Sequence, residues 1–258
     1  MEMVTSADGT PIAYELAGSG PPLVIVLGAF CDRRTAASLA KHLAQACTVI
    51  TYDRRGRGDS GDSPPYAVDR EIEDLAAVID EAGGPAAVFG HSSGAILALE
   101  AAAHGVPISK VMAYEPPYIV DAGRPRPAGL AARTRALVDA GQRDEAMTLF
   151  LTEGVQVPAP VVEGMRTAPM WAGMRSIAHT LPYDLAICGD YVMPVDRLNR
   201  VDVPALVISG ERSPAWMRDA ADALAATLPS ARRVTLDGQD HGAADDVLAP
   251  VLAGFVSA

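Results

Sequence analysis

The segment Gly90-His91-Ser92-Ser93-Gly94 restricts the fold of this chain of 258 residues more than any other segment. It directly follows an apolar, strand-like run at residues 86–89 and directly precedes a helix-like run that begins at Ala95. An abrupt turn from strand to helix strains the central residue, and a glycine two positions away on each side leaves room for the close approach. We therefore expect a strand–turn–helix unit that presents Ser92 at the edge of a sheet.

Short, apolar runs rich in β-formers recur along the chain, separated by stretches with helical periodicity. Parallel strands covered on both faces have this composition. The expected helices include residues 69–81, 94–103 and 216–228. The expected strands are a hairpin pair at 2–6 and 11–16 around Asp8-Gly9, then 23–27, 48–52, 86–89, 110–114, 205–209 and 233–236. This alternation predicts an α/β fold: a mostly parallel sheet of about eight strands with helices on both faces.

The alternation breaks between Pro116 and Arg200, where proline and glycine interrupt helical pieces at 128–140 and 143–152. We expect a helical cap inserted after the sixth strand over residues 117–200, and an α/β core formed by residues 1–116 and 201–258. Such an excursion lies over the edge where α/β sheets bind ligands. The candidates for the substrate-facing wall of the cap are Trp171, Met174 and Tyr183, although Met and aromatic residues at helical spacing also fit packing within the cap.

Ser92 has the position of a nucleophile, and His241 has that of its general base. His241 lies in a turn after the last expected strand and before a closing helix. A neutral imidazole can take the proton of a serine hydroxyl during attack and return it to the leaving group. At the start of the helix after Ser92, the Ser93 amide can bind a developing oxyanion, because unpaired amides and a partial positive charge meet there.

The acidic residue that would pair with His241 does not occur at the expected position in the sequence. The turn after residues 205–209 reads Gly210-Glu211-Arg212-Ser213-Pro214, with a serine where a Gly-x-x-Asp turn carries its aspartate. A serine cannot stabilise an imidazolium. Glu115 directly follows the expected strand at 110–114. Because Pro116 forces the chain out of the sheet, Glu115 remains at the rim of the sheet. Glu115 is our candidate acid; Glu211 and Asp240 remain alternatives.

Charge and cysteine usage restrict partners and cofactors. The formal net charge of -11 disfavours binding to nucleic acid or to an anionic membrane. The basic run Arg54-Arg55-Gly56-Arg57 lies between Asp53 and Asp59, so we expect a solvated or salt-bridged turn with a structural role. Three widely spaced cysteines form no pair at metal-ligand spacing, which predicts neither a disulfide framework nor a metal site.

The sequence also gives expectations about location and assembly. The N-terminal residues show no basic region followed by an apolar run, and no apolar stretch is long enough to cross a bilayer. We therefore expect a cytoplasmic protein that acts on a small-molecule substrate. The sequence does not decide between a monomer and a homodimer.

With these residues placed, the chain resembles the α/β-hydrolase superfamily over nearly its full length, in the serine-nucleophile branch with a lid. The run from Tyr52 to Ser60 is similar to the Asp-x-Arg-Gly-x-Gly-x-Ser turn after the family's fourth strand, which the resemblance identifies as structural. The haloalkane dehalogenase branch includes members with a glutamate acid after the sixth strand, which supports Glu115. Their nucleophile is an aspartate, so Ser92 disfavours dehalogenase and epoxide hydrolase chemistry.

The resemblance also implies a second oxyanion donor, a backbone amide after the third strand. The matching segment reads Leu27-Gly28-Ala29-Phe30. Ala29 is the matching position, Phe30 is the alternative donor, and the Phe30 side chain is a candidate for contact with substrate.

These features together predict a serine hydrolase that cleaves a small, largely apolar carboxylic ester or lactone through an acyl-enzyme, without a cofactor. One alternative is a C–C bond or thioester hydrolase in natural-product metabolism. A second alternative is a small-molecule binding protein that kept the fold but hydrolyses little, which the irregular acid position admits.

Overall fold

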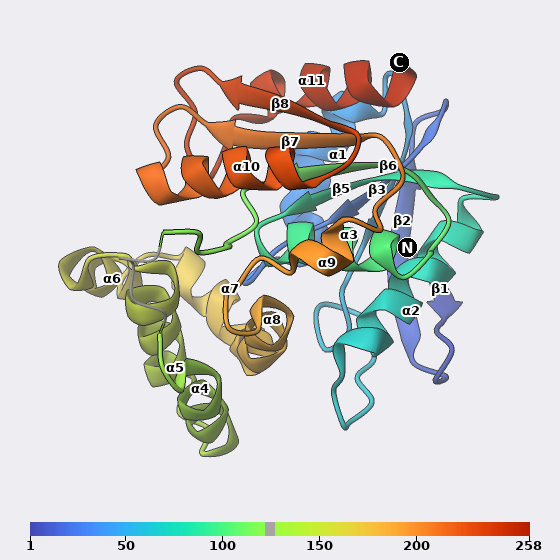
Figure 1. The fold of residues 1–258 in the computed structure, drawn as a ribbon. Helices are drawn as coiled ribbons and strands as arrows, with labels where there is room; N and C mark the ends of the chain where they lie inside the picture. The colour runs from blue at the N-terminus through green and yellow to red at the C-terminus, as the bar shows by residue number, and fades with distance from the viewer. Residues whose placement is uncertain (122–126) are drawn as a thin grey trace.

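The computed structural model describes residues 1–121 and 127–258 and contains one eight-stranded sheet (Figure 1). The order across the sheet is β1-β2-β4-β3-β5-β6-β7-β8. β2 pairs antiparallel with β1 and with β4, and every other neighbouring pair is parallel. The strands are β1 (Glu2–Thr5), β2 (Pro11–Ala17), β3 (Pro22–Val26), β4 (Thr48–Tyr52), β5 (Ala86–His91), β6 (Ile108–Tyr114), β7 (Ala205–Gly210) and β8 (Ala231–Leu236). The predicted strands and their α/β class are confirmed.

Helices cover both faces of this sheet, as the apolar composition of its strands predicts. One face packs against α1 (Ala37–Leu43) and α11 (Asp245–Ser257), and the other against α2 (Val68–Glu81), α3 (Ser93–Ala103) and α10 (Ala215–Thr227). Successive side chains of a strand point to opposite faces. In β3, Leu23 and Ile25 accordingly join one buried cluster while Val24 and Val26 join the other.

The helical insertion follows β6 and precedes β7, as expected, and in Figure 1 its helices α4 to α8 lie beside the sheet. Its elements are α4 (Leu130–Asp139), α5 (Arg143–Leu149), the π-helical segment η2 (Phe150–Val155), α6 (Ala159–Arg166), α7 (Met170–Ser176), the short 3-10 turn η3 (Ala178–Thr180), α8 (Leu181–Cys188) and α9 (Val195–Leu198). Residues 122–126, within the predicted cap, lie outside the described residues. Within the two described ranges, no helix has both the length and the apolar character needed to cross a bilayer.

Candidate active site

Ser92 lies at a sharp turn between β5 and α3. Its backbone has φ 56° and ψ -123°, and its amide donates to the Tyr114 carbonyl at 2.9 Å. A Cβ atom at Gly90 would overlap the carbonyl of Gly94, and one at Gly94 would overlap the carbonyl of Val26. Only glycine fits at these two positions, because the helix passes so close to the sheet. The sequence pattern therefore forms the strand–turn–helix unit it predicts, with Ser92 at its apex.

The structure brings His241 and Glu115 together. His241 Nδ1 lies 2.6 Å from Glu115 Oε2, although the two residues are 126 positions apart in the sequence. The other carboxylate oxygen, Oε1, accepts a hydrogen bond from the Gly210 amide at 2.8 Å. Since Glu115 engages Nδ1, the Nε2 atom of His241 is left to act as a base.

The environment of Glu115 favours its ionised form. Burial raises the pKa of this fully enclosed carboxyl, but polar interactions outweigh burial and hold its pKa below the usual value; the hydrogen bond with His241 is the largest of them, and Ser213 and the Gly210 amide add to it. A carboxylate that stays charged can stabilise the imidazolium form of His241.

The alternative acids make other contacts. Glu211 Oε2 accepts from the Gly238 amide at 2.7 Å on an exposed loop. Asp240 Oδ1 accepts from the Gly242 amide at 2.9 Å. Ser213, in the slot of the missing aspartate, is buried. Of the three candidate carboxylates, Glu115 is the one that contacts the imidazole.

Ser92 and His241 line the same cavity, which has a volume of about 210 Å³. Ala29, Phe30 and Ser93 lie in its wall as well, so the candidate oxyanion donors adjoin the nucleophile. The rest of the described wall comes from the loop after β6, from the insertion and from α10, and is largely apolar: Pro117, Phe150, Leu151, Gly154, Val155, Cys188, Tyr191, Trp216 and Met217, with His91 beside the nucleophile.

The three cap residues expected in the pocket wall lie elsewhere, and the described lining of this cavity does not include them. Trp171 donates from Nε1 to Asp144 at 2.8 Å, and Met174 is buried within the insertion. Tyr183 stacks on Tyr66 with ring centroids 3.9 Å apart. Packing within the insertion and against the core occupies these side chains, so Phe30 alone of the expected substrate-contacting residues reaches the cavity.

Much of the cap wall instead comes from a segment whose backbone conformation the sequence did not reveal. Residues 143–152 read as one helix, but α5 ends at Leu149 and passes into the π-helical segment η2. This segment supplies four lining residues, including Phe150, whose ring meets that of Phe30 edge-on at 5.5 Å. π-Helical turns occur often at functional sites. Gly154, two residues after this predicted helix, was the available signal of an irregular backbone.

Backbone strain concentrates around the cavity. Five described residues other than glycine have positive φ: Phe30, Ser92, Glu115, Gln156 and Tyr191. Three of these line the cavity, and Glu115 contacts His241. Such conformations cost about 1–3 kcal/mol each and persist only where surrounding structure enforces them. Their clustering therefore supports a functional role for the cavity.

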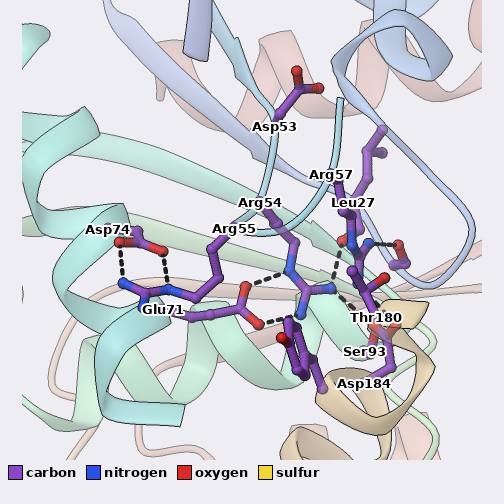
Figure 2. Close-up of polar contacts among 12 residues, drawn as sticks. Leu27, Asp53, Arg54, Arg55, Arg57, Glu71, Asp74, Ser93, Thr180 and Asp184 are labelled. Atoms are coloured by element: carbon purple, nitrogen blue, oxygen red, sulfur yellow. Dashed lines mark hydrogen bonds and ion pairs between the residues drawn. The ribbon is translucent and has the colours of Figure 1, made fainter. Parts of the chain in front are cut away.

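The basic turn after β4 is salt-bridged and buried, not solvated (Figure 2). Arg54 pairs with Glu71 through two hydrogen bonds of 2.6 and 2.7 Å, and Arg55 pairs with Asp74 at 2.8 and 2.7 Å. Arg57 pairs with Asp184 of α8 at 2.8 Å. The turn therefore links the core to the insertion.

The sequence profile of the Alpha/beta hydrolase family matches residues 23–252, which include the nucleophile turn, Glu115 and His241. The chain belongs to the alpha/beta hydrolase family. This confirms the resemblance drawn from the sequence motifs.

Individual α/β hydrolases are similar to this chain to different extents. An alpha/beta hydrolase from Sphaerobacter thermophilus DSM 20745 is 56% identical, with a TM-score of 0.95 over 98% of this chain and 99% of that chain. An uncharacterized hydrolase of Bacillus subtilis (strain 168) is 38% identical over 96 residues, 36% of this chain and 35% of that protein. The lipase LipV of Mycobacterium tuberculosis is 32% identical over 111 residues, 42% of each protein. The matched regions thus span less than half of these two curated relatives.

Proposed function

We propose that this α/β hydrolase is a serine esterase that cleaves a small, largely apolar carboxylic ester or lactone through an acyl-enzyme intermediate. The observation that carries this proposal is the shared cavity of Ser92 and His241, with Glu115 on the far side of the imidazole at 2.6 Å. These observations support a series of nucleophile, base and acid, the order that serine acylation requires.

In the proposed reaction, Ser92 Oγ attacks the substrate carbonyl while His241 Nε2 takes its proton. The Ser93 amide and an amide of the Ala29–Phe30 loop stabilise the resulting oxyanion. His241 then protonates the departing alcohol, and an acyl group stays on Ser92. A water molecule, deprotonated by the same imidazole, attacks the acyl carbon and releases the acid.

The cavity supports a small and uncharged substrate. Its volume of about 210 Å³ is below the range of roughly 300–1,000 Å³ that is common for ligand pockets. Among the described residues of its wall there is no Lys, Arg, Asp or Glu. A substrate with a free carboxylate would lose its hydration there without gaining an ion pair. The partial similarity to a lipase fits the same substrate class.

The test combines labelling with turnover. Wild type and Ser92→Ala are exposed to a fluorophosphonate probe, examined by intact-mass spectrometry, and assayed with a short-chain nitrophenyl ester. We expect one phosphonyl adduct and ester turnover in the wild type, and neither in the variant. A folded wild type without adduct or turnover would contradict the proposal and favour a binding protein.

A further inference from the structure

Asp184 connects the insertion to the nucleophile turn. It lies on α8, is fully buried, and accepts a hydrogen bond from Ser93 Oγ at 2.7 Å. The same carboxylate pairs with Arg54 Nη1 at 2.9 Å and Arg57 Nη2 at 2.8 Å (Figure 2). Three donors from two core segments therefore meet on one side chain of the insertion.

The two arginines extend this contact to the loop after β3. Arg57 Nη1 donates to the carbonyl of Gly28 at 2.6 Å and to that of Cys31 at 3.3 Å. Arg54 Nη1 donates to the carbonyl of Leu27 at 3.2 Å. The Gly28 carbonyl shares its peptide group with the Ala29 amide, and the Leu27 and Cys31 carbonyls lie before and after the Ala29–Phe30 segment, whose two amides are the candidates for the second oxyanion donor.

Asp184 is thus linked to both sides of the candidate oxyanion hole, directly to Ser93 and through two arginines to the loop after β3. On one side it holds the hydroxyl of Ser93, whose amide is one candidate donor. On the other side it orients the guanidinium groups that fix the loop carrying Ala29 and Phe30. Burial raises the pKa of Asp184, but Arg57 and Arg54 outweigh burial and hold it below the usual value, so the carboxylate stays charged.

We propose that Asp184 is a positioning residue that sets the spacing between the two oxyanion donors. The position of α8 against the core would then determine how well the transition state is stabilised. This inference rests on the proposed esterase function. Oxyanion stabilisation depends on donors held in place before the reaction, and a misplacement of about 1 Å can cost roughly 10²-fold in rate. Removing the charge should therefore slow catalysis more than it weakens substrate binding.

The chain contains a matched control in Asp74. This carboxylate, on α2, is as buried as Asp184 and pairs with Arg55 of the same turn (Figure 2). Arg55 in turn donates to Asp8 and to the Arg70 carbonyl, whereas Arg54 and Arg57 donate to carbonyls of the loop after β3. Asp74→Asn and Asp184→Asn each remove one buried negative charge that pairs with an arginine of the turn at residues 54–57. A purely structural role for Asp184 predicts that the two variants lose stability and activity in parallel.

The experiment compares the two variants with the wild type well below their melting temperatures. Readouts are kcat and KM for a nitrophenyl ester, and inhibition by a trifluoromethyl ketone, which forms a tetrahedral oxyanion adduct with serine. We expect Asp184→Asn to lower kcat by roughly 10²-fold and to weaken inhibition by the ketone by a similar factor, while KM stays within about threefold of the wild-type value. Asp74→Asn should keep kcat within about threefold of the wild type even though its melting temperature falls.

Equal kcat values in the two variants would overturn the positioning role while leaving the esterase proposal intact. Absence of ester turnover in the wild type would overturn both. If Asp184→Asn does not fold, Ser93→Ala tests the positioning role instead, because it removes only the hydroxyl that donates to Asp184 and keeps the backbone amide. A roughly tenfold lower kcat in Ser93→Ala supports the positioning role, and an unchanged kcat contradicts it.

Discussion

The imidazole of His91 donates from Nε2 to the carbonyl oxygen of His241 at 2.9 Å, and the two rings lie 4.5 Å apart. Beside it, the Tyr114 hydroxyl donates to the carbonyl of Asp240. Side chains from the ends of β5 and β6 thus hold two successive carbonyls of the loop that carries the proposed base. Burial lowers the pKa of His91 to about 3, so this ring stays neutral and adds no charge beside His241 when the latter is protonated.

Replacing His91 by phenylalanine should lower kcat by roughly tenfold with a smaller change in KM, because the loop loses a hydrogen bond that orients His241. His91→Gln, which keeps an N–H donor on a side chain of similar reach, should retain more of the activity. Steady-state kinetics on one ester substrate measure both variants. Equal kcat for His91→Phe and the wild type would show that the hydrogen bond does not position the base.

Glu115→Gln should reduce kcat on the order of 10²–10⁴-fold, because a neutral amide cannot stabilise the imidazolium of His241. The matched control is Glu211→Gln on the neighbouring loop, which should stay near the wild-type rate. An active Glu115→Gln together with an inactive Glu211→Gln would instead make Glu211 the acid.

The buried slot at Ser213 offers a second test of the same assignment. An aspartate there follows the Gly-x-x-Asp spacing that this chain lacks. We expect Ser213→Asp to restore part of the kcat that Glu115→Gln loses, measured on the double variant with the same ester. A double variant with the same kcat as Glu115→Gln would mean that a carboxylate at position 213 does not reach the imidazole of His241.

What could be predicted from the sequence is what local patterns encode. Strand runs, the glycines around Ser92 and the turn at His241 are read from neighbouring residues. The prediction of Glu115 rested on the missing aspartate at Ser213, on Pro116, which directs the chain out of the sheet after β6, and on the resemblance to a branch with a glutamate acid at this place. Cavity-lining residues of the insertion were missed, because the face that a short helix presents depends on distant partners. Asp184 gave one usable signal: it is the single charged residue of the otherwise largely apolar helix α8, and a buried carboxylate needs a partner.

The charge of Asp184 also predicts a pH dependence of stability. Its pKa is lower in the folded protein than in the unfolded chain, where the pKa of aspartate is about 3.9. Its stabilising contribution is therefore complete above this pH and is lost as the pH falls through the folded-state pKa. Relative to Asp184→Asn, the wild type should have an unfolding free energy about 3 kcal/mol larger at pH 7, and the difference should shrink below about pH 4.

Urea unfolding of both proteins at a series of pH values measures this difference. Other carboxyl groups with lowered pKa, such as Glu115, contribute to both proteins and largely cancel. A difference that stays constant or grows toward pH 3 would contradict a charged Asp184 in the folded state.

Cys188 separates the proposed catalytic cavity from a second cleft. The second cleft, about 300 Å³, lies between α2, α3 and the segment from α8 to α9, and its wall includes Ile96, Tyr118 and Arg197. Cys188 is the one described residue that lines both spaces. If the proposed function holds, we expect this side chain to limit how far a substrate chain extends from Ser92 in this direction.

Shortening this side chain should shift the preference toward longer esters. Each methylene moved from water into an apolar space contributes about 0.8 kcal/mol, a factor of about four in kcat/KM. We expect Cys188→Ala to raise the ratio of kcat/KM for eight-carbon over four-carbon substrates by roughly tenfold, in either the acyl or the alcohol series. Cys47→Ala removes a buried thiol from the opposite face of the sheet and should leave the ratio unchanged. An unaltered ratio in Cys188→Ala in both series would show that the wall lies elsewhere.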